Sequence, residues 1–189
     1  NTGYTVSQRP AMNNITGLLT DGKYGSTYTR YDPNWMGFNT TGHVVINFDM
    51  RAPGSVSQII LSSREDSANQ LTLPDNVKIY ASTNNVEWVE LASFENPQVT
   101  DGENYSFTWD ASESSFQNPL GDAAEYAYIR YIRVEFDVPA GGDYVYLDEV
   151  RAMGKLGECS TAGMPYVTDE TGARNVAIGS SYTYNPETV

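Results

Sequence analysis

The sequence contains little cysteine, histidine or positive charge, and each shortage excludes a class of function. Among 189 residues there is one cysteine, Cys159, and one histidine, His43. A single cysteine excludes an internal disulfide and zinc sites built from several cysteines, and a single histidine disfavours zinc catalysis. The chain has 11 Lys and Arg against 24 Asp and Glu, a net charge of −13. Nucleic acids and anionic membranes would meet a repulsive field, so we expect neither as a partner.

Long apolar segments and catalytic signatures are also missing. No apolar run approaches the roughly 20 residues that a membrane-spanning helix requires, so we expect no membrane insertion. There is no nucleophile elbow, phosphate-binding loop or HExxH helix. Adjacent acids such as Glu65 and Asp66 are too common in an acidic chain to indicate a glycosidase pair. We therefore expect a chain without catalytic activity, and we interpret it as a secreted or cell-surface part of a larger protein.

Several segments alternate apolar and polar residues with a period of two, which is typical of strands with one buried face. Such strands, joined by turns such as Asp21-Gly22 and Gly141-Gly142, predict two packed antiparallel sheets, an all-β sandwich. Trp88 and Trp109 lie in these patterns, and we expect both in the core. The segments are Val44–Phe48, Val56–Leu61, Val77–Ala81, Trp88–Phe94, Tyr105–Trp109, Tyr128–Phe136 and Tyr144–Met153.

The alternation ends near Gly154, which predicts a domain boundary there. Residues 155–173 are rich in Gly, Thr and small polar residues, as in a linker. Beyond them, Tyr182-Thr183 repeats the Tyr4-Thr5 pair near the start of the chain. We therefore expect residues 1–154 to form the sandwich and residues 174–189 to begin a second, similar module.

The order of four segments resembles the galactose-binding-like sandwich of discoidin, or coagulation factor 5/8 type C, domains. Within that group the bacterial carbohydrate-binding modules of family 32 are the most similar. The resemblance covers residues 1–154 and implies a jelly-roll β-sandwich that binds glycans without catalysis. The segments are LLTDGKYGSTYT at 18–29, HVVINFD at 43–49, VKIYASTNNVEWVELASF at 77–94, and YIRVEF followed by YLDEVRAMG at 131–154.

The first of these segments has the composition of a calcium-binding loop. Calcium takes roughly six to eight oxygen ligands, which tight turns supply through carbonyl groups and a few carboxylates. Asp21 would give a carboxylate, and Gly22 and Gly25 allow the loop to curl. By resemblance, Glu149 in the last strand would complete the shell of a structural calcium ion. The alternative is an ordinary Asp-Gly turn with a solvated Glu149. The candidate metal ligands are Leu19, Asp21, Lys23, Ser26, Thr27 and Glu149, with Lys23 standing where the family often has an acid.

Two loops combine aromatic and planar polar side chains, the groups that bind sugar rings and hydroxyls. They are YTRYDPNW at 28–35 and REDSAN at 64–69. By resemblance, Arg64 would hold a sugar hydroxyl. Trp35 has a core position as its alternative, and His43 is expected at the surface or hydrogen-bonded. The candidate sugar-binding residues are Arg30, Tyr31, Trp35, Arg64, Asp66 and Asn69.

Two functions from different classes remain open at this point. The first is a monomeric binding module that holds a larger protein on a polysaccharide or host glycan. The second is an interaction or adhesion domain that binds protein or spaces modules in a repeat array.

Overall fold

The computed structural model describes residues 3–26, 31–95, 97–112 and 127–156. The expected linker beyond residue 156 and the second module at 174–189 lie outside the described residues. Among the described residues no helix has the length and apolar character that crossing a bilayer would need. Two short 3-10 helices occur, η1 at Leu18–Thr20 and η2 at Ser67–Asn69. The strands are β1 Gly3–Val6, β2 Met36–Phe38, β3 Gly42–Arg64, β4 Leu71–Thr72, β5 Asp75–Ser82, β6 Val89–Phe94, β7 Asn104–Asp110, β8 Ala127–Val138 and β9 Tyr144–Leu156.

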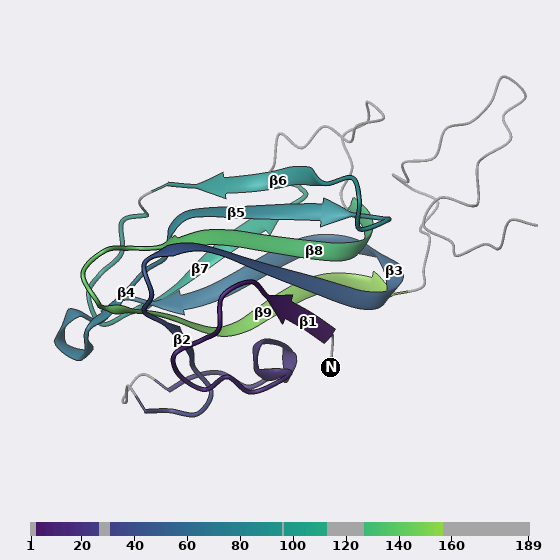
Figure 1. The fold of residues 1–189 in the computed structure, drawn as a ribbon. Helices are drawn as coiled ribbons and strands as arrows, with labels where there is room; N and C mark the ends of the chain where they lie inside the picture. Colours follow the sequence, from purple (N-terminus) through teal and green to yellow (C-terminus); the bar gives the residue numbers. More distant parts are fainter. Residues whose placement is uncertain (1–2, 27–30, 96, 113–126, 157–189) are drawn as a thin grey trace, which may run out of the picture.

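The long strand β3 belongs to both layers of a sandwich (Figure 1). Its first half pairs antiparallel with β1 and β8, and β8 continues to β5 and β6. Its second half pairs antiparallel with β7 and β9, and β9 continues to β2 and, in parallel, to β4. The partners change between Asp49 and Gly54, where the register shifts and Arg51 has a φ of 68°. The expected antiparallel β-sandwich is confirmed, with two expected strands joined into one bent strand.

The core lies between the two layers and contains the inward-facing residues of the predicted alternation. In β8, Ile132, Val134 and Phe136 are buried, while Arg133 and Glu135 between them are partly exposed. Each large apolar side chain buried in this way contributes about 1.5–3 kcal/mol to folding. The other strands provide Val44, Ile46, Phe48, Ile59, Leu61, Val77, Ile79, Phe107, Trp109, Val145 and Leu147.

The two tryptophans expected in the core differ. Trp109 is 2% exposed and lies in the core, as expected. Trp88 is only partly buried, and the guanidinium of Arg133 lies 4.0 Å from its ring centroid. The expectation for Trp88 is wrong because this residue precedes β6 and stacks on an arginine of the outer face of the sheet.

A second apolar cluster lies on the other face of β9. Trp35, Leu71 and Tyr146 are buried there, with Met12 and Tyr144 packed against them. The rings of Trp35 and Tyr146 are stacked with their centroids 6.0 Å apart. This cluster fixes the loop that follows η1 and the loop that carries η2 to the same part of β9, away from the main core.

Candidate functional site

A β-bulge in β9 turns two consecutive acids toward the same side of the sheet. Leu147 and Val150 both face the core although they are three positions apart, whereas positions on one face of a regular strand are an even number apart. Val150 pairs with Leu61, and Leu147 pairs with Ser63. A single residue of β3 therefore faces the two acids between them, Asp148 and Glu149, which is the arrangement of a bulge. Both acids consequently face away from the core.

The loop that follows η1 lies on these two acids. Leu18 and Leu19 in η1 are buried in the core and anchor the start of the loop. The amide of Gly22 donates to Glu149 Oε1 at 3.2 Å, and the amide of Gly25 donates to Asp148 Oδ2 at 3.1 Å. A side chain at Gly25 would overlap the ring of Trp35, so only glycine allows this close approach.

The two acids of the bulge are buried without a countercharge in contact. Asp148 is 1% exposed and Glu149 is 5% exposed. Within the described part of the chain, Asp148 Oδ1 and Glu149 Oε2 have no hydrogen-bond partner. Burial raises the pKa of the Asp148 carboxyl, and burial together with the nearby charges of Asp21 and Asp148 raises the pKa of Glu149 to about 7. Buried carboxylates with unsatisfied oxygens are costly unless a cation is bound.

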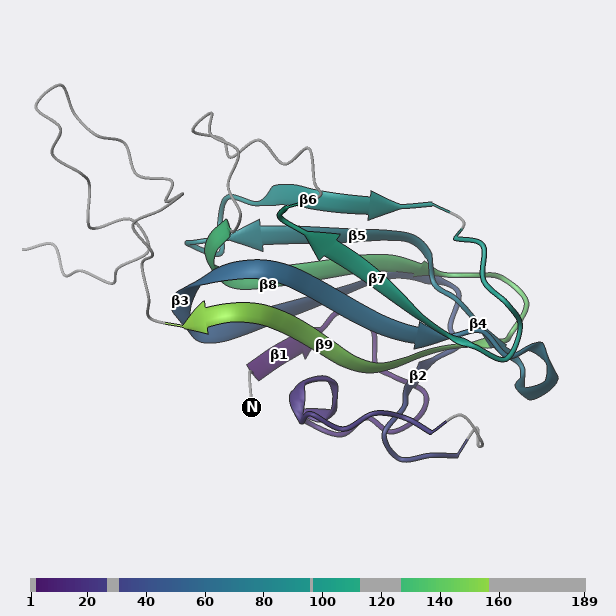
Figure 2. The same cartoon turned by 180° about the vertical axis from the view of Figure 1, so that it is seen from behind.

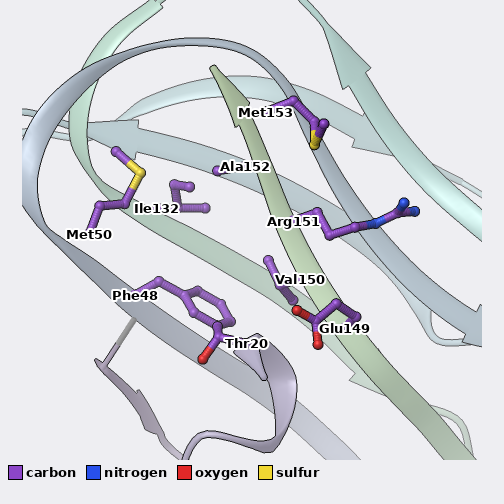
Figure 3. Close-up of a pocket in the computed structure, with 9 residues that line it drawn as sticks. All are labelled: Thr20, Phe48, Met50, Ile132, Glu149, Val150, Arg151, Ala152 and Met153. Atoms are coloured by element: carbon purple, nitrogen blue, oxygen red, sulfur yellow. The ribbon is translucent and has the colours of Figure 1, made fainter. Parts of the chain in front are cut away.

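A pocket lies beside Glu149, and Arg151 is among the residues that line it. The pocket has a volume of about 290 Å³ and includes Phe48, Met50 and Ile132 in its walls. Figure 3 shows it between β3, with Phe48 and Met50, and β9, with Glu149 and Val150. Glu149 is nevertheless buried, and this burial disfavours its charged form.

The other predicted metal ligands occupy different positions. The side chain of Leu19 is fully buried, so only its carbonyl could be a ligand. Lys23 is exposed, and its Nζ lies 3.6 Å from Asp21 Oδ2. The backbone of Ser26 is hydrogen-bonded to residues outside the bulge. Its amide donates to Asp32 at 2.7 Å, and its carbonyl accepts from Trp35 Nε1 at 3.0 Å.

Thr27 lies outside the described residues. Among the residues that are described, no three His, Cys, Asp or Glu side chains converge as a metal-binding group. A cation at this place would therefore depend on carbonyl oxygens in addition to carboxylates, as hard cations do in loops. Asp148 was missed in the sequence, although the apolar positions 147 and 150 on either side of the two acids already interrupt the two-residue period.

The second candidate loop folds around the carboxylate of Asp66, which is 7% exposed. This carboxylate accepts hydrogen bonds from Arg64 Nη2 at 2.9 Å and from Asn69 Nδ2 at 3.0 Å. The hydrogen bonds from Asn69 and Arg64 hold the pKa of Asp66 below its usual value. Arg64 is 5% exposed and also donates to Asn104 at 3.1 Å. Its guanidinium therefore supports the loop in this structure. The resemblance had instead suggested that Arg64 would contact a sugar hydroxyl.

In the described part of the first candidate loop, the two aromatic residues differ in exposure, and Tyr28 lies outside the described residues. Tyr31 is 75% exposed, whereas Trp35 is 1% exposed and belongs to the cluster with Leu71 and Tyr146. The expectation of a sugar-stacking Trp35 is wrong, and its alternative, a core position, agrees with this burial. Arg30 lies outside the described residues.

Trp35 and Leu71 pack together, which brings the 31–35 loop and the η2 loop to the same end of the sandwich (Figures 1 and 2). Tyr31, Asp66 and Asn69 therefore lie on neighbouring loops. His43, expected at the surface or hydrogen-bonded, is exposed and lies 2.8 Å from Asp137.

Comparisons with known proteins give matches in structure only. No protein-family model matches the sequence. No curated protein matches it either.

Several solved structures with a similar fold are carbohydrate-binding modules and lectin domains, and part of a GH29 fucosidase from Ruminococcus gnavus also matches. The module CpGH89CBM32-6 produced by Clostridium perfringens is 17% identical, with 82% of this chain and 94% of that chain covered and a TM-score of 0.52. Chitosan-binding module 1 of a chitosanase/glucanase from Paenibacillus sp. IK-5 is 15% identical, with 82% and 96% covered and a TM-score of 0.52. The lectin domain of lectinolysin, complexed with Lewis B antigen, is 16% identical, with 82% and 94% covered and a TM-score of 0.55. The chain thus has the galactose-binding-like β-sandwich fold that its sequence resembles.

Proposed function

We propose that this chain is a non-catalytic carbohydrate-binding module of a larger secreted bacterial protein, with a structural calcium ion. The observation that carries the proposal is the meeting of the 31–35 and η2 loops at one end of a fold shared with glycan-binding proteins. Two of the similar structures contain glycans, namely Lewis B antigen and GalNAc-β-1,3-galactose. A rigid sandwich that presents polar and aromatic loop residues is a common basis for such binding.

At this end, Tyr31 and Asn69 are the residues best suited to contact a sugar. The exposed ring of Tyr31 can stack on the C–H face of a pyranose. Asn69 is partly exposed, and Asp66 fixes its side-chain amide through a 3.0 Å hydrogen bond. A fixed amide loses little conformational entropy when it binds a hydroxyl group. Arg64 and Asp66 would act behind it by holding the loop in place.

Calcium would suit the bulge because two carboxylates lie there, each with an oxygen that has no partner among the described residues, and the charge of Arg151 acts on Glu149 alone. Asp148 and Glu149 would supply carboxylates, and Asp21 and the carbonyl groups of the loop would supply further oxygens. A bound calcium ion neutralises these charges and links them. The role would be structural, since the ion would join the loop at 18–26 to the final strand.

A glycan array followed by calorimetry tests the carbohydrate proposal. We expect binding of at least one glycan by the wild-type chain, and a loss of about fivefold or more in affinity for Tyr31→Ala and Asn69→Ala. Asn14→Ala, at an exposed asparagine of another loop, is the control and should bind as the wild type does. An array without any bound glycan would favour the interaction or spacer function instead.

Calorimetric titration of chelator-treated protein tests the calcium proposal separately. We expect one calcium ion to bind, and Glu149→Gln to weaken this binding by at least tenfold, because the variant loses a charged ligand. The control is Glu87→Gln, at an exposed glutamate in the turn before β6. Equal calcium affinity in both variants would show that the ion does not bind at the bulge.

A further inference from the structure

A groove lies on the outer face of the other sheet, near the start of β1 and the β5–β6 turn. Its volume is about 440 Å³, within the usual range for small-ligand sites. The start of β1 and the β5–β6 turn are at the end of the sandwich opposite to η2 and β4 (Figures 1 and 2). The groove is therefore separate from the loops proposed above to bind sugar.

Polar and aromatic side chains line the groove, and the guanidinium of Arg130 lies over one of them, 4.9 Å from the ring centroid of Tyr131. Asn47 and Tyr131 lie on neighbouring strands and face outward, since Phe48 and Ile132 beside them face the core. Asn47 uses its Oδ1 to accept from Arg133 Nε at 2.7 Å, and among the described residues its Nδ2 has no partner. The side chain of Asn85 has none in the same part of the chain.

The β5–β6 turn holds Asn85 in a fixed position. The amide of Asn85 donates to Ser82 Oγ at 2.9 Å, and Asn84 Oδ1 accepts from the amides of Val86 and Glu87 at 2.9 Å each. Asn85 itself has a φ of 62°, which asparagine tolerates better than most residues. The turn thus fixes the backbone from which the side chain of Asn85 reaches the groove.

The charges of the groove differ in sign from the net charge of the chain. Asp49 is the acid that lines it, and Arg130 neutralises this carboxylate through two hydrogen bonds of 2.8 and 3.0 Å. Arg51 also lines the groove, is exposed, and its charge acts on the same Asp49 carboxylate. Two arginines, Arg51 in the groove and Arg130 beside it, therefore face one acid at this place, in a chain with a net charge of −13.

Arg51 is held at the bend of β3. Its φ of 68° is uncommon for a residue with a long side chain, and its amide donates to Asp49 Oδ1 at 2.8 Å. Strained positions of this kind persist where the surrounding structure determines them, and they are frequent at ligand sites. From this bend Arg51 lines the same groove as Asn47 and Tyr131.

We propose that this groove is a second binding site, specific for a sugar that carries a carboxylate, such as a hexuronic acid. The Arg51 guanidinium would pair with the carboxylate, the Tyr131 ring would contact the sugar ring, and Asn47 and Asn85 would bind its hydroxyl groups. The inference rests on the proposed carbohydrate-binding function only for the choice of a sugar as the ligand. The cation, the amides and the aromatic ring are features of the groove itself.

Titration of the ¹⁵N-labelled chain with digalacturonate, followed by NMR, tests this site. We expect the side-chain amide signals of Asn47 and Asn85 to shift, and the affinity to fall as salt is added, because an ion pair is screened. Arg51→Gln should weaken binding by about tenfold or more. Arg9→Gln, at an exposed arginine outside the groove, is the matched control and should leave the affinity unchanged.

Two further sugars of different charge make the outcome specific. Neutral galactobiose should shift the same signals but bind with at least about tenfold lower affinity than digalacturonate. Chitobiose, which is cationic, should not shift them. The inference is overturned if digalacturonate leaves Asn47 and Asn85 unshifted, or if galactobiose binds there as well as digalacturonate. Shifts at Asn69 report the proposed loop site independently, so either site can fail without the other.

Discussion

Two buried groups of acids in this protein have opposite surroundings. In the η2 loop, the carboxylate of Asp66 contacts the guanidinium of Arg64 at 2.9 Å, and hydrogen bonding lowers its pKa. In the β9 bulge, Glu149 accepts a hydrogen bond from the backbone amide of Gly22, Asp148 is hydrogen-bonded to the backbone amide of Gly25 and to the side chain of Ser62, and the pKa values of both acids are raised. All three acids are at most 7% exposed.

The difference teaches that burial alone does not define the role of an acid. Asp66 has its cation two residues earlier in the sequence, so the η2 loop is electrostatically complete within the chain. The bulge contains two acids, and Asp148 Oδ1 and Glu149 Oε2 have no partner among the described residues. The first group is thus explained by folding alone, whereas the proposed calcium ion would neutralise the second.

Removing the carboxylate of Asp66 should have the largest effect. Asp66→Ala leaves the buried guanidinium of Arg64 without its acid, and breaking a buried ion pair costs about 3–5 kcal/mol. Urea denaturation measures the free energy of unfolding. Asp143→Ala, at an exposed acid of the β8–β9 turn, is the control and should cost less than about 0.5 kcal/mol. Similar losses for both variants would mean that the Arg64–Asp66 pair does not stabilise the loop.

Calcium should stabilise the chain by a somewhat smaller amount. At a free concentration of 100 times its dissociation constant, a ligand that binds only the folded state contributes about 2.7 kcal/mol. We expect the melting temperature of chelator-treated protein to rise on addition of calcium. The double variant Asp148→Asn, Glu149→Gln should lose this response and be more stable than the wild type without calcium, because two buried charges are gone. If the melting temperature of the double variant still rises with calcium, the two acids of the bulge do not bind the ion.

The pH dependence of the stability of the calcium-free protein should distinguish Glu149, whose pKa is raised, from Asp66, whose pKa is lowered. The pKa of Glu149 is about 7 in the folded state against 4.5 for an ordinary glutamate, so the folded state binds more protons between these values. Stability should therefore fall as the pH rises from about 4.5 to 7, by on the order of 2 kcal/mol. Asp66 has a lowered pKa, so its contribution is lost only as the pH falls below about 4.

Denaturation of the wild type and of Glu149→Gln at pH 5 and pH 7.5, both with chelator, measures this slope. The variant lacks the titrating group, and its stability should change less between the two pH values. Equal slopes would assign the pH dependence to other groups.

The sequence predicted the sandwich because alternation with a period of two reports directly which face of a strand is buried. All seven predicted segments contribute to strands of the structure. It did not predict β1, β2 and β4, since strands of two to four residues are too short to alternate visibly. It also divided β3 in two, because the bend at Arg51 interrupts the pattern.

The candidate sites were predicted less well than the fold, because they depend on contacts between distant parts of the chain. Trp35 is buried by Tyr146, which lies in the last strand, and by the close approach of Gly25. Arg64 is held partly by Asn104, on β7. Neither contact leaves a periodic signal in the sequence. Asp148 did leave one, an extra residue between two inward-facing positions, and a bulge explains it.

Lys23 should have the smallest effect, although it is a cation close to the bulge. Its side chain is 69% exposed, and its Nζ lies 3.6 Å from Asp21 Oδ2. An exposed ion pair contributes little, so Lys23→Gln should change the free energy of unfolding by less than about 0.5 kcal/mol, as measured by urea denaturation with chelator. A loss of more than about 1 kcal/mol would mean that Lys23 neutralises the bulge, and the bulge would then be complete without calcium, like the η2 loop. The expected small change instead leaves Asp148 and Glu149 dependent on a cation from solution.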